Sequence, residues 1–179
     1  MTAVVSWRTS WLVPLAFAVS FAAPGCDGME TRMRDSGATE AEMSQVRSMA
    51  ADWRWKHRLL VVAVESDDVR FDRQRAMVTE ASEEWLDRNL LLIMLAGEEG
   101  WVIDDPSAAR SGWKPLSAGE AAAFRRRYDL GDVLGDVEFE AVLVGKDGGV
   151  KDRYREIVDP SAIFPFIDAM PMRMDEMRE

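Results

Sequence analysis

Four methionines near the carboxyl terminus are the side chains best suited to metal chemistry in this sequence. They share a thioether and fall at nearly alternate positions: Met170, Met172, Met174 and Met177. A thioether sulfur is a soft ligand that suits Cu(I). Methionine also fills irregular gaps in apolar cores. The pattern therefore leaves Cu(I) handling and packing open, and we favour packing.

Cysteine and histidine occur once each, as Cys26 and His57. One cysteine cannot form a disulfide within the chain, and the two residues cannot build a Cys/His zinc cluster. His57 stands between Lys56 and Arg58. Beside two cations it is expected to be a solvated edge residue rather than a catalytic base. We predict no cofactor and no catalytic residue.

Ser66, Asp67 and Asp68 form a possible functional loop after an apolar run. Their carboxylates could bind a cation or take part in acid–base chemistry. The same residue types cap helix N-termini, where negative charge is favoured. We favour capping.

A βαβ unit is predicted around this loop. Residues 58–64 and 90–96 are continuous apolar runs typical of strands buried on both faces. The segment 69–88 between them has apolar residues spaced by three or four, as in an amphipathic helix. The two strands should be parallel.

The remaining elements follow in a simple order. We expect a loop over 98–115, a helix over 117–128, a strand over 138–144, a hairpin turn over 146–149, a return strand over 150–157 and a last helix from 159 to 170. Pro165 is awkward inside that last helix, which could begin later. The order predicts an α/β, thioredoxin-like fold, with a small mixed central sheet and helices on both faces.

Two clusters of aromatic and basic residues have a packing interpretation and a binding one. Trp53 and Trp55 alternate with Arg54 and Lys56, and we expect the tryptophans to pack on the domain. The run 125–127 is all arginine, and we expect a solvated helix face with ion pairs.

Three segments resemble a known family. The stretches 55–61, 144–151 (with its GKDGG turn) and 167–177 (with DAMPMR and then EM) are similar to domain-of-unknown-function family 4174 over about residues 53–177. The resemblance implies a thioredoxin-like fold, an extracytoplasmic setting and a relation to domains in animal sushi-repeat and coiled-coil-containing matrix proteins. It implies no activity. Asn89 departs from the acid that is more usual there.

Thioredoxin chemistry needs a reactive thiolate where the first strand meets the first helix. Residues 65–69 contain no sulfur, and residues 136–138 lack the proline that thioredoxins place before the third strand. We therefore do not expect cysteine-based redox activity.

The first 25 residues resemble a secretion signal, with Arg8, an apolar run and small residues after it. Ala23-Pro24-Gly25-Cys26 resembles a lipobox, which predicts lipidation of Cys26. Cleavage after Ala22 and an uncleaved anchor helix are the alternatives. We expect a tether over 26–50, in which a helical approach from Ser44 to Trp53 is possible, and the domain over 51–177.

The formal net charge of -10 opposes binding to nucleic acid and to anionic lipid. We expect a periplasmic or cell-envelope protein, held at the membrane only by its N-terminal lipid. Its expected role is binding or structural, with an unknown envelope protein or ligand as partner. The alternatives are an oxidoreductase- or peroxiredoxin-related protein acting without its own cysteines, and Cu(I) handling.

Overall fold

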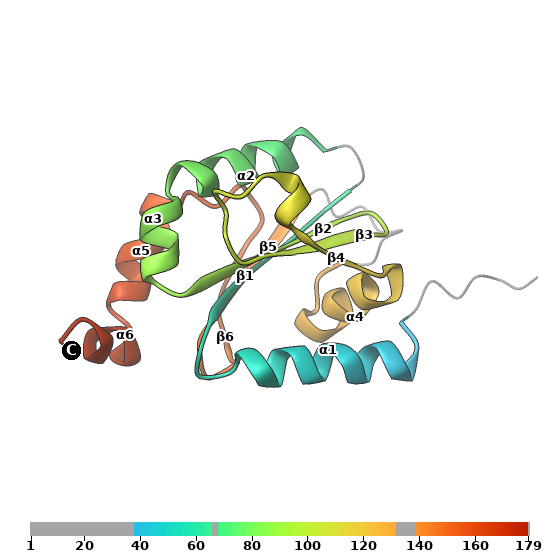
Figure 1. Ribbon diagram of the computed structural model, residues 1–179, viewed down its shortest axis with the longest axis horizontal. Coiled ribbons are helices and arrows are strands. Elements are labelled where there is room, and N and C mark those ends of the chain that lie inside the picture. Colours follow the sequence, from blue (N-terminus) through green and yellow to red (C-terminus); the bar gives the residue numbers. More distant parts are fainter. Residues whose placement is uncertain (1–37, 66–67, 132–138, 179) are drawn as a thin grey trace, which may run out of the picture. The chain divides into compact units, whose positions relative to one another are not determined.

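The computed structural model describes residues 38–65, 68–131 and 139–178 (Figure 1). Its strands are β1 (Arg58–Val64), β2 (Leu90–Ala96), β3 (Glu99–Ile103), β4 (Lys114–Leu116), β5 (Phe139–Val144) and β6 (Val150–Tyr154). Its helices are α1 (Glu40–Trp53), α2 (Val69–Glu80), α3 (Ser82–Asp87), α4 (Ala118–Tyr128), α5 (Pro160–Asp168) and α6 (Pro171–Glu176), with a 3₁₀ turn, η1, at Arg110–Gly112.

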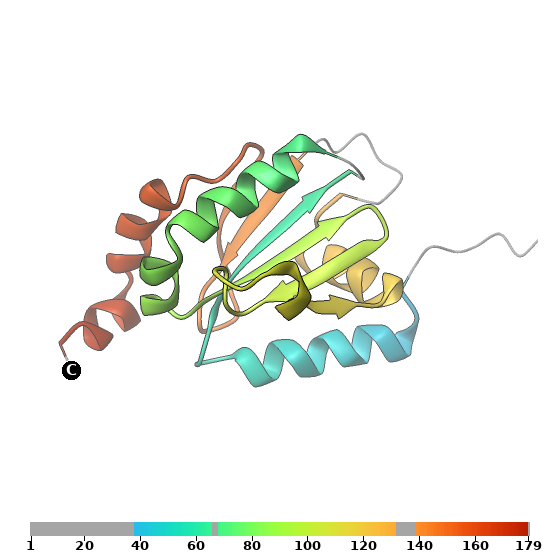
Figure 2. The same cartoon turned by 45° about the horizontal axis from the view of Figure 1, so that its top comes forward.

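One mixed sheet of six strands joins these elements, in the order β4-β3-β2-β1-β5-β6, and several of its strands can be followed side by side in Figure 2. β1 and β2 pair in parallel, from Arg58 opposite Leu90 to Val64 opposite Ala96. β5 is antiparallel to β1, and β6 is antiparallel to β5. The predicted βαβ unit and hairpin are confirmed, and the architecture is consistent with a thioredoxin-like fold.

The two faces of the sheet bury separate apolar clusters, because alternate residues of a strand point to opposite sides. Leu60 packs in the cluster that contains Trp85 of α3, and α2 and α5 contribute to the same cluster. Leu59 packs in the other, with Phe124 of α4, and α1 contributes there. Figure 1 shows α2 and α1 on opposite sides of the sheet. All seven residues of β1 are buried, as a strand covered on both faces requires.

The segment 98–115, predicted as a loop, contains β3, η1 and most of β4, so that prediction is wrong. β3 turns back on β2 directly, with Glu99 opposite Ala96, and β4 pairs with β3. The glycine and proline residues of this segment are typical of loops, so the sequence did not indicate either strand. Pro115 lies in β4 at the edge of the sheet, where a missing N–H costs no ladder hydrogen bond.

The helical regions also differ from expectation. The segment predicted as one helix over 69–88 divides at Ala81, whose φ of -100° and ψ of 26° are not helical. Residues 40–50, which the sequence indicates as tether, lie in α1, and the possible helix from Ser44 to Trp53 is confirmed as part of it. Trp53 at its end stacks on Phe124 with ring centroids 6.1 Å apart. Trp55 is 58% exposed, so packing is confirmed for Trp53 and wrong for Trp55.

The carboxyl-terminal third follows its local sequence signals. Gly148 has a φ of +81° in the β5–β6 turn, and its N–H donates to the carbonyl of Gly145 at 2.8 Å. Asp159 caps α5 by accepting from the N–H of Ser161, and Pro160 opens the helix. The helix therefore does not begin later, and it accommodates Pro165 in its interior.

Candidate functional site

A groove of about 600 Å³ lies at the carboxyl edge of the parallel strands, beside the start of α2. We call it the acidic groove. It is lined by Asp68, Val69, Phe71 and Asp72 at the start of α2, by Ala96, Glu98, Glu99 and Trp101 of β2, β3 and their turn, and by Arg110 of η1. In open α/β sheets, ligands bind outside the carboxyl ends of the strands. A ligand-binding site is therefore expected at this edge of the sheet.

Asp68 lines the groove and is the N-cap of α2. Its carboxylate accepts from the backbone N–H of Arg70 at 2.8 Å and also pairs with the Arg70 guanidinium. The hydrogen bond from that side chain holds the pKa of Asp68 below its usual value. The capping role predicted for Asp68 is confirmed. A carboxylate that is a weak base at neutral pH is suited to attracting cations and poorly suited to accepting a proton.

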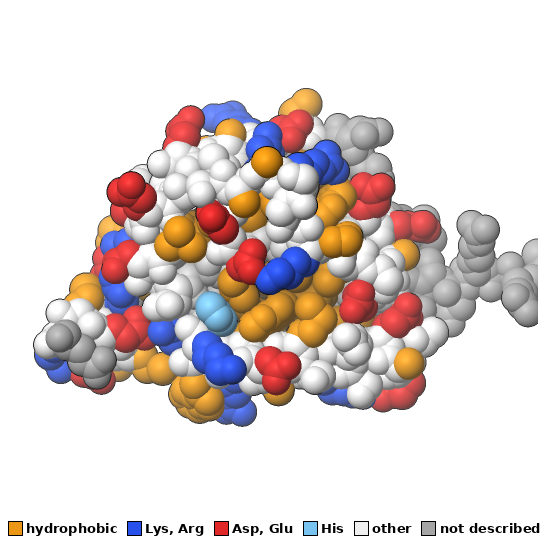
Figure 3. Space-filling model, in the orientation of Figure 1, with side chains coloured by type: hydrophobic (Ala, Val, Ile, Leu, Met, Phe, Trp, Pro, Cys, Tyr) orange, Lys and Arg blue, Asp and Glu red, His pale blue; other side chains and the backbone are white. Residues whose placement is uncertain are grey.

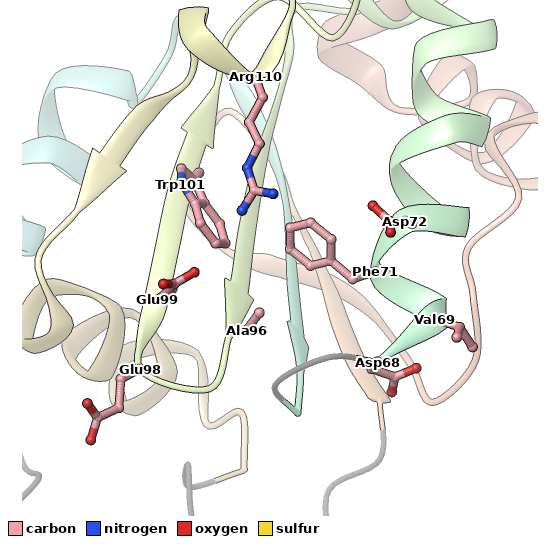
Figure 4. A pocket seen from close by; sticks show the side chains of 9 residues that line it. All are labelled: Asp68, Val69, Phe71, Asp72, Ala96, Glu98, Glu99, Trp101 and Arg110. Atoms are coloured by element: carbon pink, nitrogen blue, oxygen red, sulfur yellow. The ribbon is translucent and has the colours of Figure 1, made fainter.

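Aromatic rings form the apolar part of the groove. Phe71 and Trp101 meet edge to face, with centroids 5.6 Å apart, and Figure 4 shows them pointing toward each other from α2 and β3. The guanidinium of Arg110 lies 4.9 Å from the centroid of Trp101 and 5.7 Å from that of Trp113. Cations are attracted to aromatic faces at these distances. Trp101 thus already holds one guanidinium from the chain itself.

The lining contains more carboxylates than cations. Asp68, Asp72, Glu98 and Glu99 belong to it with the one cation of Arg110, while Asp68 also pairs with Arg70 and Asp72 with Arg75 beside the groove. Glu98, Glu99 and Asp72 are exposed. Carboxylates on the rim and aromatic faces within are groups that attract ammonium and guanidinium ions.

Arg125 secures the strand ends behind this edge, and the sequence analysis missed it. It is only 5% exposed, and its Nη2 donates to the carbonyls of Val64, Leu95 and Gly97, each at 3.2 Å. The prediction of a solvated arginine face is therefore wrong for Arg125. A usable signal was its spacing from Ala121 and Tyr128, both buried, which places it on the inner face of α4.

His57 lies between two further hollows, one of about 370 Å³ and one of about 420 Å³. Figure 3 shows the chain's single histidine beside a patch of apolar side chains, and the larger hollow includes Trp53 and Leu116. Burial, and then the nearby ammonium of Lys146, lower the pKa of His57. His57 is half-buried rather than fully solvated.

The four carboxyl-terminal methionines divide into two pairs. Met170 and Met172 line a pocket of about 320 Å³, the cationic pocket, whose other side chains include Arg58, Lys146 and Lys151. Met174 and Met177 are exposed and are not part of its lining. Three cationic side chains around the first pair disfavour a bound Cu(I) ion there.

The three segments that carry the family resemblance meet beside this pocket. Arg58 of the first segment and Lys146 of the second both form ion pairs with Glu176 of the third. The N–H of Trp55 donates to the carbonyl of Lys146 at 2.7 Å. Residues far apart in the chain therefore form one buried ionic cluster at the amino end of β1.

Several predicted features lie outside the described residues: the segment 1–25, Cys26, Ser66 and Asp67. Within the described part of the chain, no helix is long and apolar enough to cross a membrane. The same residues hold no group of three His, Cys, Asp or Glu side chains placed to bind a metal ion.

Comparison with known proteins finds one family. The model of DUF4174, a domain of unknown function, matches residues 49–176, which is most of the chain. No curated protein matches. The matched range contains both the acidic groove and the cationic pocket.

Proposed function

The chain belongs to the DUF4174 family of unknown function, and we propose that it is a binding module whose acidic groove receives a basic segment of a cell-envelope protein. The observation that carries this proposal is the lining of the groove, which combines four carboxylates with the paired rings of Phe71 and Trp101.

The geometry suits a lysine or arginine side chain. The stem of such a side chain covers apolar surface while its charged end stays near water and acids. Trp101 offers the apolar face, and the exposed side chains of Glu98 and Glu99 belong to the same lining. Arg110 already occupies this face, 4.9 Å from the ring centroid. A bound basic segment would take the place of Arg110 or stack beside it.

Binding is favoured over catalysis by the groups present. The strand–helix corner has no cysteine in its sequence, and the depressed pKa of Asp68 makes it a poor proton acceptor. An oxidoreductase-related role without the chain's own cysteines is the alternative. Reduction of insulin disulfides by the purified chain, with no added partner, would favour that alternative over ours.

The proposed setting is the periplasm or cell envelope, with the chain anchored through lipidated Cys26. Support for it comes from the sequence, where an apolar signal-like segment ends at the chain's single cysteine. Intact mass of the protein extracted from membranes tests it. A mass that begins at Cys26 and includes acyl chains is expected, whereas an unmodified amino terminus would reject the anchor.

Fluorescence anisotropy with a labelled hexa-arginine peptide tests the groove. The double variant Glu98→Gln/Glu99→Gln should weaken peptide binding by about tenfold, since it removes two of the four carboxylates. Raising NaCl from about 50 mM to about 500 mM should weaken binding to the parent chain further, because exposed charges are screened.

The net negative charge of the chain would attract a basic peptide to any part of its surface. A control variant with the same change in net charge is therefore needed. Glu83 and Glu84 of α3 are also exposed, and they do not line the groove. Glu83→Gln/Glu84→Gln changes the net charge equally and should alter affinity less than twofold. Equal losses in the two double variants would reject the groove as the site.

A further inference from the structure

We propose that the cationic pocket, at the amino end of β1, binds a small carboxylate with an apolar tail, of the size of a medium-chain fatty acid. β1 runs from Arg58, which lines this pocket, to Val64, whose carbonyl lies at the other edge of the sheet. The site is therefore separate from the acidic groove, and its occupant has the opposite charge.

The local charge is the first reason. Arg58, Lys146 and Lys151 line the pocket with one carboxylate, Asp147, although the whole chain carries a net charge of -10. Lys151 and Asp147 pair with each other at 2.7 Å. Arg58 and Lys146 remain, and because they share the single carboxylate of Glu176, together they leave one excess positive charge beside the pocket.

The burial of these two cations is the second reason. Arg58 is 1% exposed and Lys146 is 8% exposed, and among the described residues both pair with the same carboxylate, that of Glu176. Buried cations are costly unless they are matched by anions. A third cation near Glu176, Arg173, already has Asp87 and Asp168 as partners.

The apolar side chains of the pocket define the rest of the ligand. Phe166, Met170, Pro171 and Met172 belong to the same lining as the charged groups, and Phe166 is 44% exposed. A volume of about 320 Å³ is at the small end of ligand pockets, which run from roughly 300 to 1,000 Å³. An anionic head with a short hydrocarbon tail satisfies both kinds of lining.

Isothermal titration of the full chain with sodium octanoate tests this inference. Octanoate should bind with one-to-one stoichiometry and at least about tenfold more tightly than 1-octanol or inorganic phosphate. Octanol lacks the charge and phosphate lacks the tail. Equal affinity for octanol would overturn the role of the cations, and equal affinity for phosphate would overturn the role of the apolar lining. Absence of octanoate binding would overturn the site itself.

A pair of variants places the binding in this pocket. Met172→Glu introduces a carboxylate among the surplus cations, so it should lower octanoate affinity by about tenfold or more and raise the melting temperature. Met174→Glu makes the same change two residues away, at an exposed side chain outside the lining, and should leave affinity within twofold. The same loss in both variants would overturn the proposal. If either variant fails to fold, the comparison of octanoate with octanol on the parent chain still tests the proposal.

Discussion

Arg58 and Glu176 lie 118 positions apart in the chain and are joined by two hydrogen bonds, each 3.2 Å long. The guanidinium also donates to the carbonyl of Arg88 at 2.9 Å. Glu176 in turn pairs with Lys146 at 2.8 Å. One carboxylate of α6 thus connects the start of β1 with the β5–β6 turn, and it holds the short last helix against the sheet.

Replacing Glu176 by Gln should lower the free energy of unfolding by about 3 kcal/mol, because two buried cations lose their shared anion. Asp175→Asn is the matched control on the same helix. Its partner, Arg178, is as exposed as Asp175 itself, and such surface pairs contribute about 0–1 kcal/mol. Urea denaturation of the two variants measures the difference. If the two variants lost similar free energies of unfolding, the ionic cluster would not be what holds α6 in place.

Acidification should destabilise the chain through Glu176 and Asp168. Burial raises the pKa of each group, but hydrogen bonds from Lys146 and Arg58 for Glu176, and from Arg88 and Arg173 for Asp168, outweigh it, so both pKa values lie below the ordinary 4.5 and 3.8.

Because each folded-state pKa is depressed, the folded chain binds protons less tightly than the unfolded chain. The stabilisation is complete above the ordinary pKa values and is lost as the pH falls through the depressed ones. Urea titrations from about pH 6 to pH 3 should show this fall in the free energy of unfolding. In the variant Glu176→Gln, the free energy of unfolding should fall less steeply with decreasing pH. An unchanged pH dependence would show that Glu176 does not contribute to it.

Arg125→Met should destabilise the chain by about 2–3 kcal/mol, since the carbonyls of Val64, Leu95 and Gly97 lose a charged donor in a buried place. Arg127→Met provides the control, because Arg127 is exposed and lies over the ring of Tyr128. That variant should change stability by less than about 1 kcal/mol. Thermal and urea unfolding distinguish the two, and an equal effect would show that Arg125 does not secure the strand ends.

Gly148→Ala should cost about 1 kcal/mol of stability, because a φ of +81° is unfavourable for a residue with a Cβ. No atom lies within 4 Å of the added Cβ, so the cost comes from the backbone alone. Gly149→Ala should be nearly neutral, since its Cβ would meet only ordinary contacts at 3.6 Å or more. Equal stability of the two variants would contradict this account of the turn.

Local signals in the sequence correctly placed the elements whose residues interact with near neighbours. The cap at Asp68 and the turn at Gly148 depend on contacts within a few positions. β1 and β2 were recognised from their continuous apolar runs, although their pairing partners lie far apart in the chain. The same signals failed over 98–115, where glycine and proline indicate a loop. β3 and β4 form there because β2 offers a free edge, and an edge is a property of the assembled sheet.

The sequence by itself determined the order of the principal strands and helices, the absence of a thiol at the corner between β1 and α2, and the net negative charge. Only the tertiary structure decided which charges lie together. It brought four carboxylates and Trp101 into the lining of one groove at one edge, and it paired Arg58 and Lys146 with Glu176 at the other. The physical reason is that ion pairs and pockets depend on distance in space, and spacing along the chain specifies that distance only within a single helix, strand or turn.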